Sequence, residues 1–154
     1  MTPEGRPASG IPRKLADLLE ALRLVPDRGE RIQMLIGIAN RFRKVSPQIA
    51  SPPYPEDHRV PACESQAYVW AEERPDGTLK FHFAVENPQG ISAMATSVIL
   101  DETLSGAPLE EVARVPRDII YDIFGNELSM GKSMGLMGIV SMVQNFAKRR
   151  LARG

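Results

Sequence analysis

A proline-rich segment, from Ser46 to Pro61, divides the chain. Proline lacks a backbone N–H and its ring clashes with the preceding helical turn, so no continuous helix can run through this segment. Loops of this length in a small domain are usually functional or disordered. The sequence therefore predicts separate elements before and after a long loop that contains Pro47, Pro52, Pro53, Pro55 and Pro61.

Two helices are predicted before this loop. Pro12 suits the first position of a helix, and leucines then recur on one helical face at Leu15, Leu18, Leu19 and Leu22. Asp27, with Glu30 three residues later, is typical of a capping box at the start of the second helix. The predicted buried stripe of that helix is Ile32, Leu35, Ile36, Ala39 and Phe42, and its solvated side carries Arg28, Arg31, Arg41 and Arg43.

A β-hairpin is predicted directly after the loop. The first strand runs from Gln66 to Glu73, followed by the strong turn signal Arg74-Pro75-Asp76-Gly77. From Leu79 to Val85 the alternation of side chains indicates a half-buried returning strand. In the first strand, one face carries Ala67, Val69 and Ala71, and the other carries Tyr68 and Trp70.

The remaining elements are predicted to be helical. Pro108 and Pro116 suit the first turns of two short helices, Gly125 caps the second, and a last helix runs from about Ser133 to Leu151. The first helix of this region has an apolar face formed by Ile91, Met94, Ala95, Val98 and Ile99.

This order of elements indicates an α+β fold. A small antiparallel β-sheet, a hairpin core of two to three strands, is expected to pack against several α-helices that cover one of its faces. Residues 1–10 lack periodicity and are predicted to form a disordered N-terminal tail, and residues 11–154 to form a single domain.

The composition excludes several functions. Nineteen basic and nineteen acidic residues give zero net charge, which disfavours general nucleic-acid binding, and no apolar run approaches the ~20 residues that a membrane span needs. The single cysteine, with only two histidines, cannot supply an internal disulfide, an iron–sulfur cluster or a structural zinc site. A reducing, cytoplasmic location is therefore expected.

The single cysteine, Cys63, lies between the proline-rich segment and the first predicted strand. Irregular backbone that enters a rigid element suits a side chain that must meet another molecule. A lone cysteine is also often a small buried hydrophobic residue. The sequence leaves both interpretations open.

Two motifs in the chain resemble the SufE family. Ala62-Cys63-Glu64-Ser65-Gln66-Ala67-Tyr68 is similar to the family's Gly-Cys-x-Ser-x-Val-Trp segment, and Ser129-Met130-Gly131-Lys132-Ser133-Met134-Gly135-Leu136 to its Ser-x-Ser-Arg-x-x-Gly-Leu segment. The order of elements agrees from about Pro12 to Arg150. Ala62 replaces glycine and is expected to hold the backbone to ordinary φ values. Tyr68 replaces tryptophan, and Lys132 replaces arginine and loses its bidentate fork.

The resemblance implies a SufE/IscU-like fold and a function in iron–sulfur cluster assembly. The protein would accept sulfur on Cys63 from the persulfide of a PLP-dependent, SufS-like cysteine desulfurase and would stimulate that enzyme. It would then pass the sulfur to a SufBCD-like scaffold complex. It implies no cofactor beyond a transient persulfide on Cys63, no metal, and no stand-alone enzyme activity. Neither nucleic acid nor membrane is an expected partner.

Residues near the two motifs are predicted to support Cys63 or to dock the partner. The glycines Gly131, Gly135 and Gly138 would allow close approach of the last helix to the Cys63 loop. Met130, Met134, Met137 and Met142 are expected to fill the core and, secondarily, to form a soft apolar shelter for a persulfide or a docking surface. The supporting and docking residues are Arg59, Glu64, Ser65, Gln66, Lys132 and Gly135.

Two other functions remain open from the residues. The chain could be a non-catalytic interaction module in which Cys63 is inert. Less favoured is a cysteine-dependent hydrolase or transferase with His58 or His82 as the base, which would also need an oxyanion hole.

Overall fold

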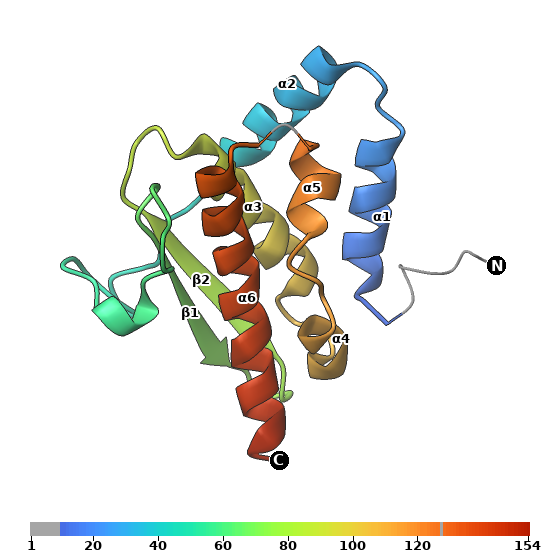
Figure 1. The fold of residues 1–154 in the computed structure, drawn as a ribbon. Coiled ribbons are helices and arrows are strands. Elements are labelled where there is room, and N and C mark those ends of the chain that lie inside the picture. The colour runs from blue at the N-terminus through green and yellow to red at the C-terminus, as the bar shows by residue number, and fades with distance from the viewer. Residues whose placement is uncertain (1–9, 127) are drawn as a thin grey trace.

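The computed structural model describes residues 10–126 and 128–154. The predicted disordered tail, apart from Gly10, lies outside the described residues. Figure 1 shows the order of the elements along the chain. They are α1 (Arg13–Arg23), α2 (Arg28–Ala39), the short 3₁₀ helix η2 (Glu56–His58), β1 (Ala67–Glu73), β2 (Leu79–Val85), α3 (Ile91–Leu104), α4 (Leu109–Ala113), α5 (Ile119–Phe124) and α6 (Met130–Ala152).

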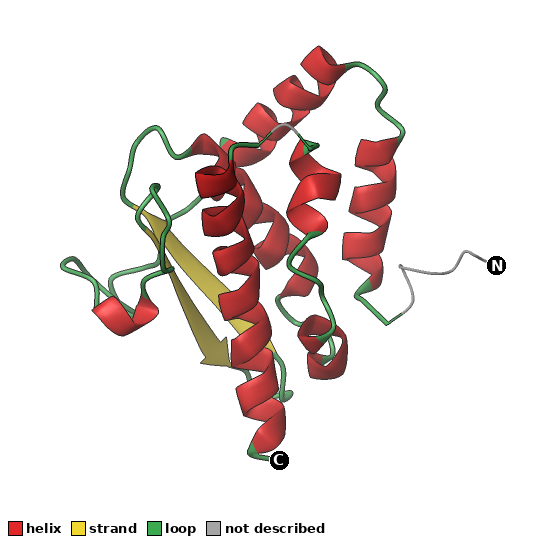
Figure 2. Ribbon diagram, viewed as in Figure 1, coloured by secondary structure: helices red, strands yellow, loops and turns green. Residues whose placement is uncertain are grey.

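The two strands form an antiparallel hairpin, which confirms the predicted α+β fold. The register pairs Ala67 with Val85 at one end and Glu73 with Leu79 at the other. Asp76 accepts hydrogen bonds from the backbone N (3.0 Å) and Oγ1 (2.6 Å) of Thr78, which fixes the predicted turn. Figure 2 shows the short 3₁₀ helix η2 on one side of the strands and the α-helices gathered on the opposite side.

The main core lies between that side of the hairpin and the helices. α6 packs on β1 and α3 on β2, and α1 and α2 then pack on α3. Leu15, Leu19 and Leu22 are buried as predicted, whereas Ile91, assigned to the apolar face of α3, is 46% exposed. Burial in α3 begins two residues later, at Ala93, and Ile91 is the first residue of the helix.

The other face of the hairpin is also covered, although helices were expected on one face only. The proline-rich segment folds back over it, so that the Tyr54 ring lies 5.1 Å from that of Tyr68 and 5.2 Å from that of Trp70. Val45 joins this second apolar cluster, and its N donates to Phe83 O (2.8 Å). The long loop therefore covers the second face of the sheet, as Figure 1 also shows.

α2 differs from its predicted pattern. Asp27 caps the helix as expected, accepting from Glu30 N at 2.8 Å, but the helix ends at Ala39, so Phe42 lies beyond it. Ile32, predicted to be buried, is 44% exposed, while Ile38 is buried in the core. Leu35 and Ala39 of the predicted stripe are buried together with Ile38, so burial is confined to the C-terminal half of the helix.

Arg31 was predicted on the solvated side, and this prediction is wrong. Its guanidinium donates to Leu22 O (2.7 Å), Asp122 O (3.0 Å) and Ile123 O (3.3 Å). The last carbonyls of a helix have no partner within the helix. One arginine therefore satisfies carbonyls at the ends of both α1 and α5.

Two predicted helix starts are displaced. α6 begins at Met130 rather than near Ser133, because Ser129 is its N-cap and its Oγ accepts from Lys132 N (3.2 Å). α4 follows Pro108 directly, whereas α5 begins only at Ile119, after a turn that closes from Ile119 N to Pro116 O (3.2 Å). In the part of the chain described, no helix combines the length and the apolar character needed to cross a membrane.

Candidate functional site

Cys63 lies in a short loop that connects the proline-rich segment to β1. Two backbone hydrogen bonds close this loop, from Gln66 N to Cys63 O (3.1 Å) and from Val60 N to Ala67 O (2.8 Å). Cys63 is 7% exposed and belongs to the main core cluster. The thiol is therefore enclosed by protein rather than presented to solvent.

The connection between β2 and α3 holds the Cys63 loop on one side. Asn87 donates from its backbone N to Ser65 O (3.1 Å) and from Nδ2 to Glu64 O (3.4 Å). Glu86 N donates to Gln66 O (3.1 Å). Ser65 and Gln66 thus tie the loop down through their backbone carbonyls.

Two residues of the loop have left-handed backbone conformations. Ala62 has φ 58° and Gln66 has φ 55°, although neither is glycine. The expectation that Ala62 holds the backbone to ordinary φ values is therefore wrong: the tight turn before Cys63 requires positive φ whichever residue occupies it. A left-handed conformation costs an L-residue with a Cβ about 1–2 kcal/mol, so the loop is strained on both sides of the thiol.

The N-terminal half of α6 approaches the Cys63 loop from the other side, as its glycines predicted. A Cβ at Gly135 would lie 3.1 Å from Cys63 Cα and 3.3 Å from Sγ, and one at Gly138 would lie 2.7 Å from Val60 Cγ1. At Gly131 the nearest atom would be Glu64 Oε2 at 3.7 Å, an ordinary contact. Gly135 and Gly138 therefore let the helix backbone pack directly on the loop.

A small cavity adjoins the thiol. Its volume is about 20 Å³, which is room for about one water-sized group. The loop, the first turn of α3 and the first turns of α6 enclose it. Its lining residues are Cys63, Glu64, Ser65, Ser92, Gly131, Lys132, Gly135 and Leu136.

The cavity brings together most of the residues that the two motifs indicated. Lys132 arrives from α6, so a cationic side chain does line the Cys63 cavity. Arg59 does not line it and instead pairs with Glu56 (3.7 Å), and Gln66 is exposed at the far end of the loop. Sequence reasoning missed Ser92, because the start of α3 carries no motif and only folding places it beside the loop.

Both histidines are engaged away from the thiol. His58 Nδ1 lies 2.8 Å from Val69 O, and its ring stacks on Trp70 with centroids 5.3 Å apart. His82 Nε2 lies 2.9 Å from Glu72 Oε1. Neither lines the Cys63 cavity.

Burial raises the pKa of Tyr68, with the charge of Glu86 as a second cause, so the Tyr68 hydroxyl stays protonated at neutral pH.

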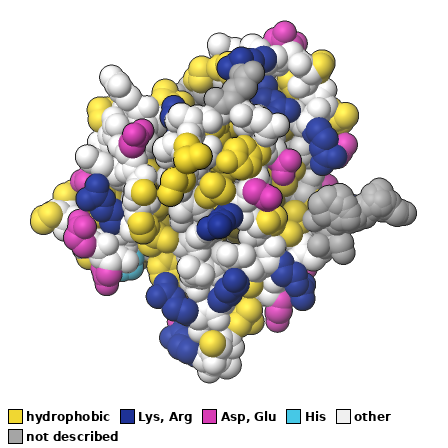
Figure 3. Space-filling view, in the orientation of Figure 1, with side chains coloured by type: hydrophobic (Ala, Val, Ile, Leu, Met, Phe, Trp, Pro, Cys, Tyr) yellow, Lys and Arg dark blue, Asp and Glu magenta, His cyan; other side chains and the backbone are white. Residues whose placement is uncertain are grey.

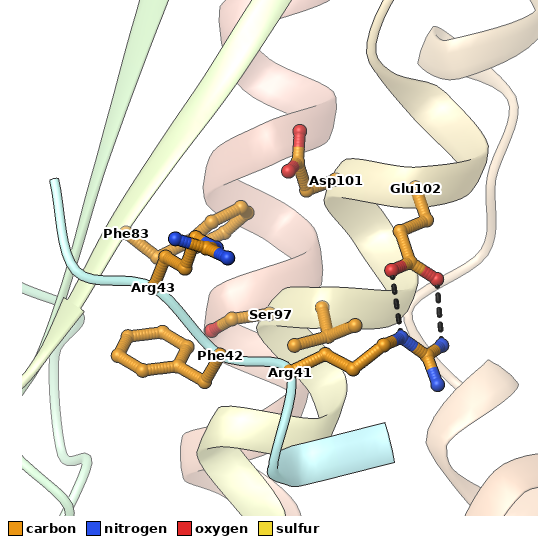
Figure 4. Close-up of a pocket in the computed structure, with 8 residues that line it drawn as sticks. Arg41, Phe42, Arg43, Phe83, Ser97, Asp101 and Glu102 are labelled. Carbon is orange, nitrogen blue, oxygen red and sulfur yellow. Dashed lines mark hydrogen bonds and ion pairs between the residues drawn. The ribbon is translucent and has the colours of Figure 1, made fainter.

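A second cavity, of 180 Å³, lies between α3 and the segment after α2 (Figure 4). Arg41 and Glu102 pair there through two hydrogen bonds, of 3.0 and 2.8 Å. Asp101 accepts from Lys80 Nζ and from Ser105 Oγ, both at 2.6 Å. The carboxylates of this cavity are already paired, and the Ser97 hydroxyl donates to Ala93 O (2.8 Å), so the cavity offers less chemistry than the Cys63 cavity.

Exposed apolar side chains flank the Cys63 cavity. Met130 is 79% exposed, Met134 52% and Ile91 46%, and each is next in sequence to a residue that lines the cavity. We call these three residues the apolar rim. Figure 3 shows hydrophobic side chains gathered over the upper half of α6. Met137 and Met142, in contrast, pack against the core, so the methionines of α6 divide between the two predicted uses.

The fold and the site define a small α+β domain with one enclosed thiol, and among residues 10–126 and 128–154 no cluster of side chains is suited to hold a metal ion. The sequence matches the SufE family, described as an Fe-S metabolism associated domain, over residues 16–147. The chain belongs to this family, which gives it a role in Fe–S metabolism. None of the curated proteins compared with it matches.

One similar solved structure is the solution structure of a hypothetical protein from Thermus thermophilus. It is 24% identical, and the match covers 92% of this chain and 98% of that chain with a TM-score of 0.72. At this level of identity the similarity supports the fold.

Proposed function

We propose that the protein is a sulfur acceptor and carrier, with Cys63 as the catalytic residue. The protein takes sulfur on Cys63 from the persulfide of a cysteine desulfurase and stimulates that enzyme. It then passes the sulfur to a scaffold on which iron–sulfur clusters are assembled. The observation that carries the proposal is the enclosed Cys63 thiol at the junction of both family motifs, beside Lys132 and Gly135. The protein would work in the cytoplasm as an accessory to the desulfurase.

The transfer needs only thiol chemistry. The Cys63 thiolate attacks the terminal sulfur of the donor persulfide, the donor's S–S bond breaks, and the donor cysteine leaves as a thiolate. A thiolate of the acceptor then attacks the terminal sulfur on Cys63 and releases the Cys63 thiolate. Each step replaces one S–S bond by another, and the proton of the attacking thiol passes to solvent or to the departing thiolate. No external oxidant or reductant and no resident cofactor is needed.

A donor cysteine must reach Sγ of Cys63, but the protein encloses this thiol. The cavity of about 20 Å³ has room for a sulfur-sized group but none for the chain of a donor protein. The Cys63 loop must therefore move outward when the donor docks. The strain at Ala62 and Gln66 lowers the free energy needed for that movement, because opening the loop relieves both left-handed conformations.

The apolar rim is the surface on which the desulfurase would dock. Exposed methionines adapt to the shape of a partner surface because their side chains are flexible. Met130 and Met134 flank Gly131 and Gly135, so a partner that covers them also covers the cavity mouth. Lys132 lies between them and would meet an acidic group of the donor or stabilise the departing thiolate.

Intact-mass spectrometry tests the proposal. The protein is mixed with a cysteine desulfurase and cysteine, and the mass is compared for the native chain, Cys63→Ser and the control Ser51→Ala, which changes an exposed residue outside the cavity. We expect a reductant-sensitive gain of one or more sulfur atoms in the native chain and in Ser51→Ala, and none in Cys63→Ser. If the native chain gains no sulfur and does not change the desulfurase rate, the non-catalytic interaction module with an inert Cys63 replaces this proposal.

A further inference from the structure

A dense positively charged surface lies at the C-terminal end of α6, far from Cys63. Phe146, Arg149, Arg150 and the C-cap residue Arg153 follow the spacing i, i+3, i+4, i+7 and so share one helical face. With Ala71, Glu73 and Leu79 of the hairpin they line a hollow of 290 Å³, which we call the arginine hollow. Figure 3 shows Lys and Arg side chains gathered at this end of the molecule.

The cations of this surface outnumber its carboxylates. Glu73 pairs with Arg150, whose Nε lies 3.4 Å from Oε1, and accepts a hydrogen bond from Arg153 on Oε2. The Arg149 guanidinium lies 4.8 Å from the centroid of the Phe146 ring and has no carboxylate partner in the described part of the chain. Lys148 is exposed beside it. Three arginines and one carboxylate, that of Glu73, therefore line the hollow.

Structural roles explain only part of this arrangement. Positive side chains in the last turn of a helix interact favourably with the helix dipole. The pairs with Glu73 also fasten the end of β1 to α6. Neither role accounts for an open hollow whose apolar lining is formed by Ala71, the buried Leu79 and Phe146. Nor does either role account for Arg149, which has no acidic partner among the described residues.

We propose that the arginine hollow docks an acidic segment of a partner protein. One apolar side chain of the segment enters the hollow over Ala71, Leu79 and Phe146, and neighbouring carboxylates bind Arg149 and Arg153. Arginine binds carboxylates in a bidentate way, and its guanidinium is weakly hydrated, so it suits such an interface. The chain as a whole has zero net charge, so this local excess of positive charge attracts acidic partners to one place.

The hollow is separated from Cys63 along α6. Cys63 packs on Gly135, in the second turn of α6, whereas Arg149 lies fourteen residues further along the same helix. At 1.5 Å per residue the two places are about 21 Å apart. The docking surface is therefore independent of the sulfur chemistry proposed for Cys63.

Fluorescence anisotropy tests this proposal with a labelled synthetic peptide of about twelve residues in which Asp and Glu alternate with Leu and Phe. We expect saturable binding that weakens at least about tenfold in Arg149→Glu/Arg153→Glu and as NaCl rises from about 0.05 to about 0.5 M. Arg149→Gln should weaken it less. The matched control Arg13→Glu/Arg23→Glu changes two exposed arginines of α1 and should leave the affinity unchanged.

Two further probes and a map of the bound site complete the experiment. A peptide with Ala in place of Leu and Phe should bind more weakly, and amide NMR shifts should centre on residues 71–73, 79 and 146–153. Absence of saturable binding, equal affinity of the charge-reversed variant, or tighter binding of a DNA duplex or anionic phosphatidylserine vesicles would overturn the proposal. No desulfurase takes part, so failure here leaves the function proposed for Cys63 unaffected.

Discussion

Replacing Gly135 by alanine tests how tightly α6 encloses Cys63. The new Cβ would lie 3.1 Å from Cys63 Cα, 3.3 Å from Sγ and 3.4 Å from Cβ. Alanine in a helix is favoured over glycine by about 1 kcal/mol, and overpacking typically costs about 1–3 kcal/mol. With a contact penalty of about 2 kcal/mol, we expect Gly135→Ala to lower the free energy of unfolding by about 1 kcal/mol. The loop should also move outward and expose the thiol.

The matched control is Gly37→Ala in α2, where an added Cβ meets nothing within 4 Å. This control should raise the free energy of unfolding by about 1 kcal/mol, because only helix propensity changes. The two variants should therefore differ by about 2 kcal/mol in urea unfolding. The rate at which Cys63 reacts with a soluble disulfide reagent should rise several-fold in Gly135→Ala and stay unchanged in Gly37→Ala.

Gly135→Ala could instead stabilise the protein as much as Gly37→Ala and leave the thiol reactivity unchanged. That result would mean that the helix and the loop do not press on one another. The close approach at Gly135 would then have no part in enclosing Cys63.

Three further predictions concern single side chains. Ala62→Gly should raise the free energy of unfolding by about 0.5–1 kcal/mol in urea titration, because glycine adopts φ 58° without strain; a loss of stability would contradict the strain. Arg31→Met should lower the free energy of unfolding by about 2 kcal/mol, since three helix-end carbonyls lose their donor. An effect below a few tenths of a kcal/mol would show that water replaces the guanidinium. The hydrogen bond from Arg153, followed by the charges of Arg153 and Arg150, lowers the pKa of Glu73. The stability that Glu73 contributes is therefore present above its unfolded pKa and is lost as pH falls through the lowered folded value. An NMR titration of Glu73 should show this low midpoint and its rise in Arg153→Ala, and an unchanged midpoint would count against the pairing.

Local patterns predicted the elements well where one segment carries its own signal. The leucines of α1 and the alternation and turn of the hairpin gave correct faces, because helical and strand periodicity depend on neighbours in sequence. The pattern was less informative for α2. There Ile32 and Phe42 fit the apolar period, but only the contact with α3 selects the face that is buried.

The candidate site was predicted in part. The motifs indicated Cys63, Lys132 and Gly135, and the structure brings these three together. Ser92 carries no signal of its own, and Arg59, near Cys63 in sequence, pairs elsewhere. Closeness in sequence is a poor guide to closeness in space on irregular backbone, because one residue of turn redirects the next side chain.

Periodicity, turn chemistry and composition were enough to predict the order of the elements, the α+β class and the position of the only cysteine. The folded structure was needed to show that the proline-rich loop covers the second face of the sheet, that Ala62 has a left-handed backbone conformation, and that Gly135 packs against the thiol. These features come from contacts between segments far apart in the chain. Their free energy depends on how those segments fit together in space, which no local pattern of residues records.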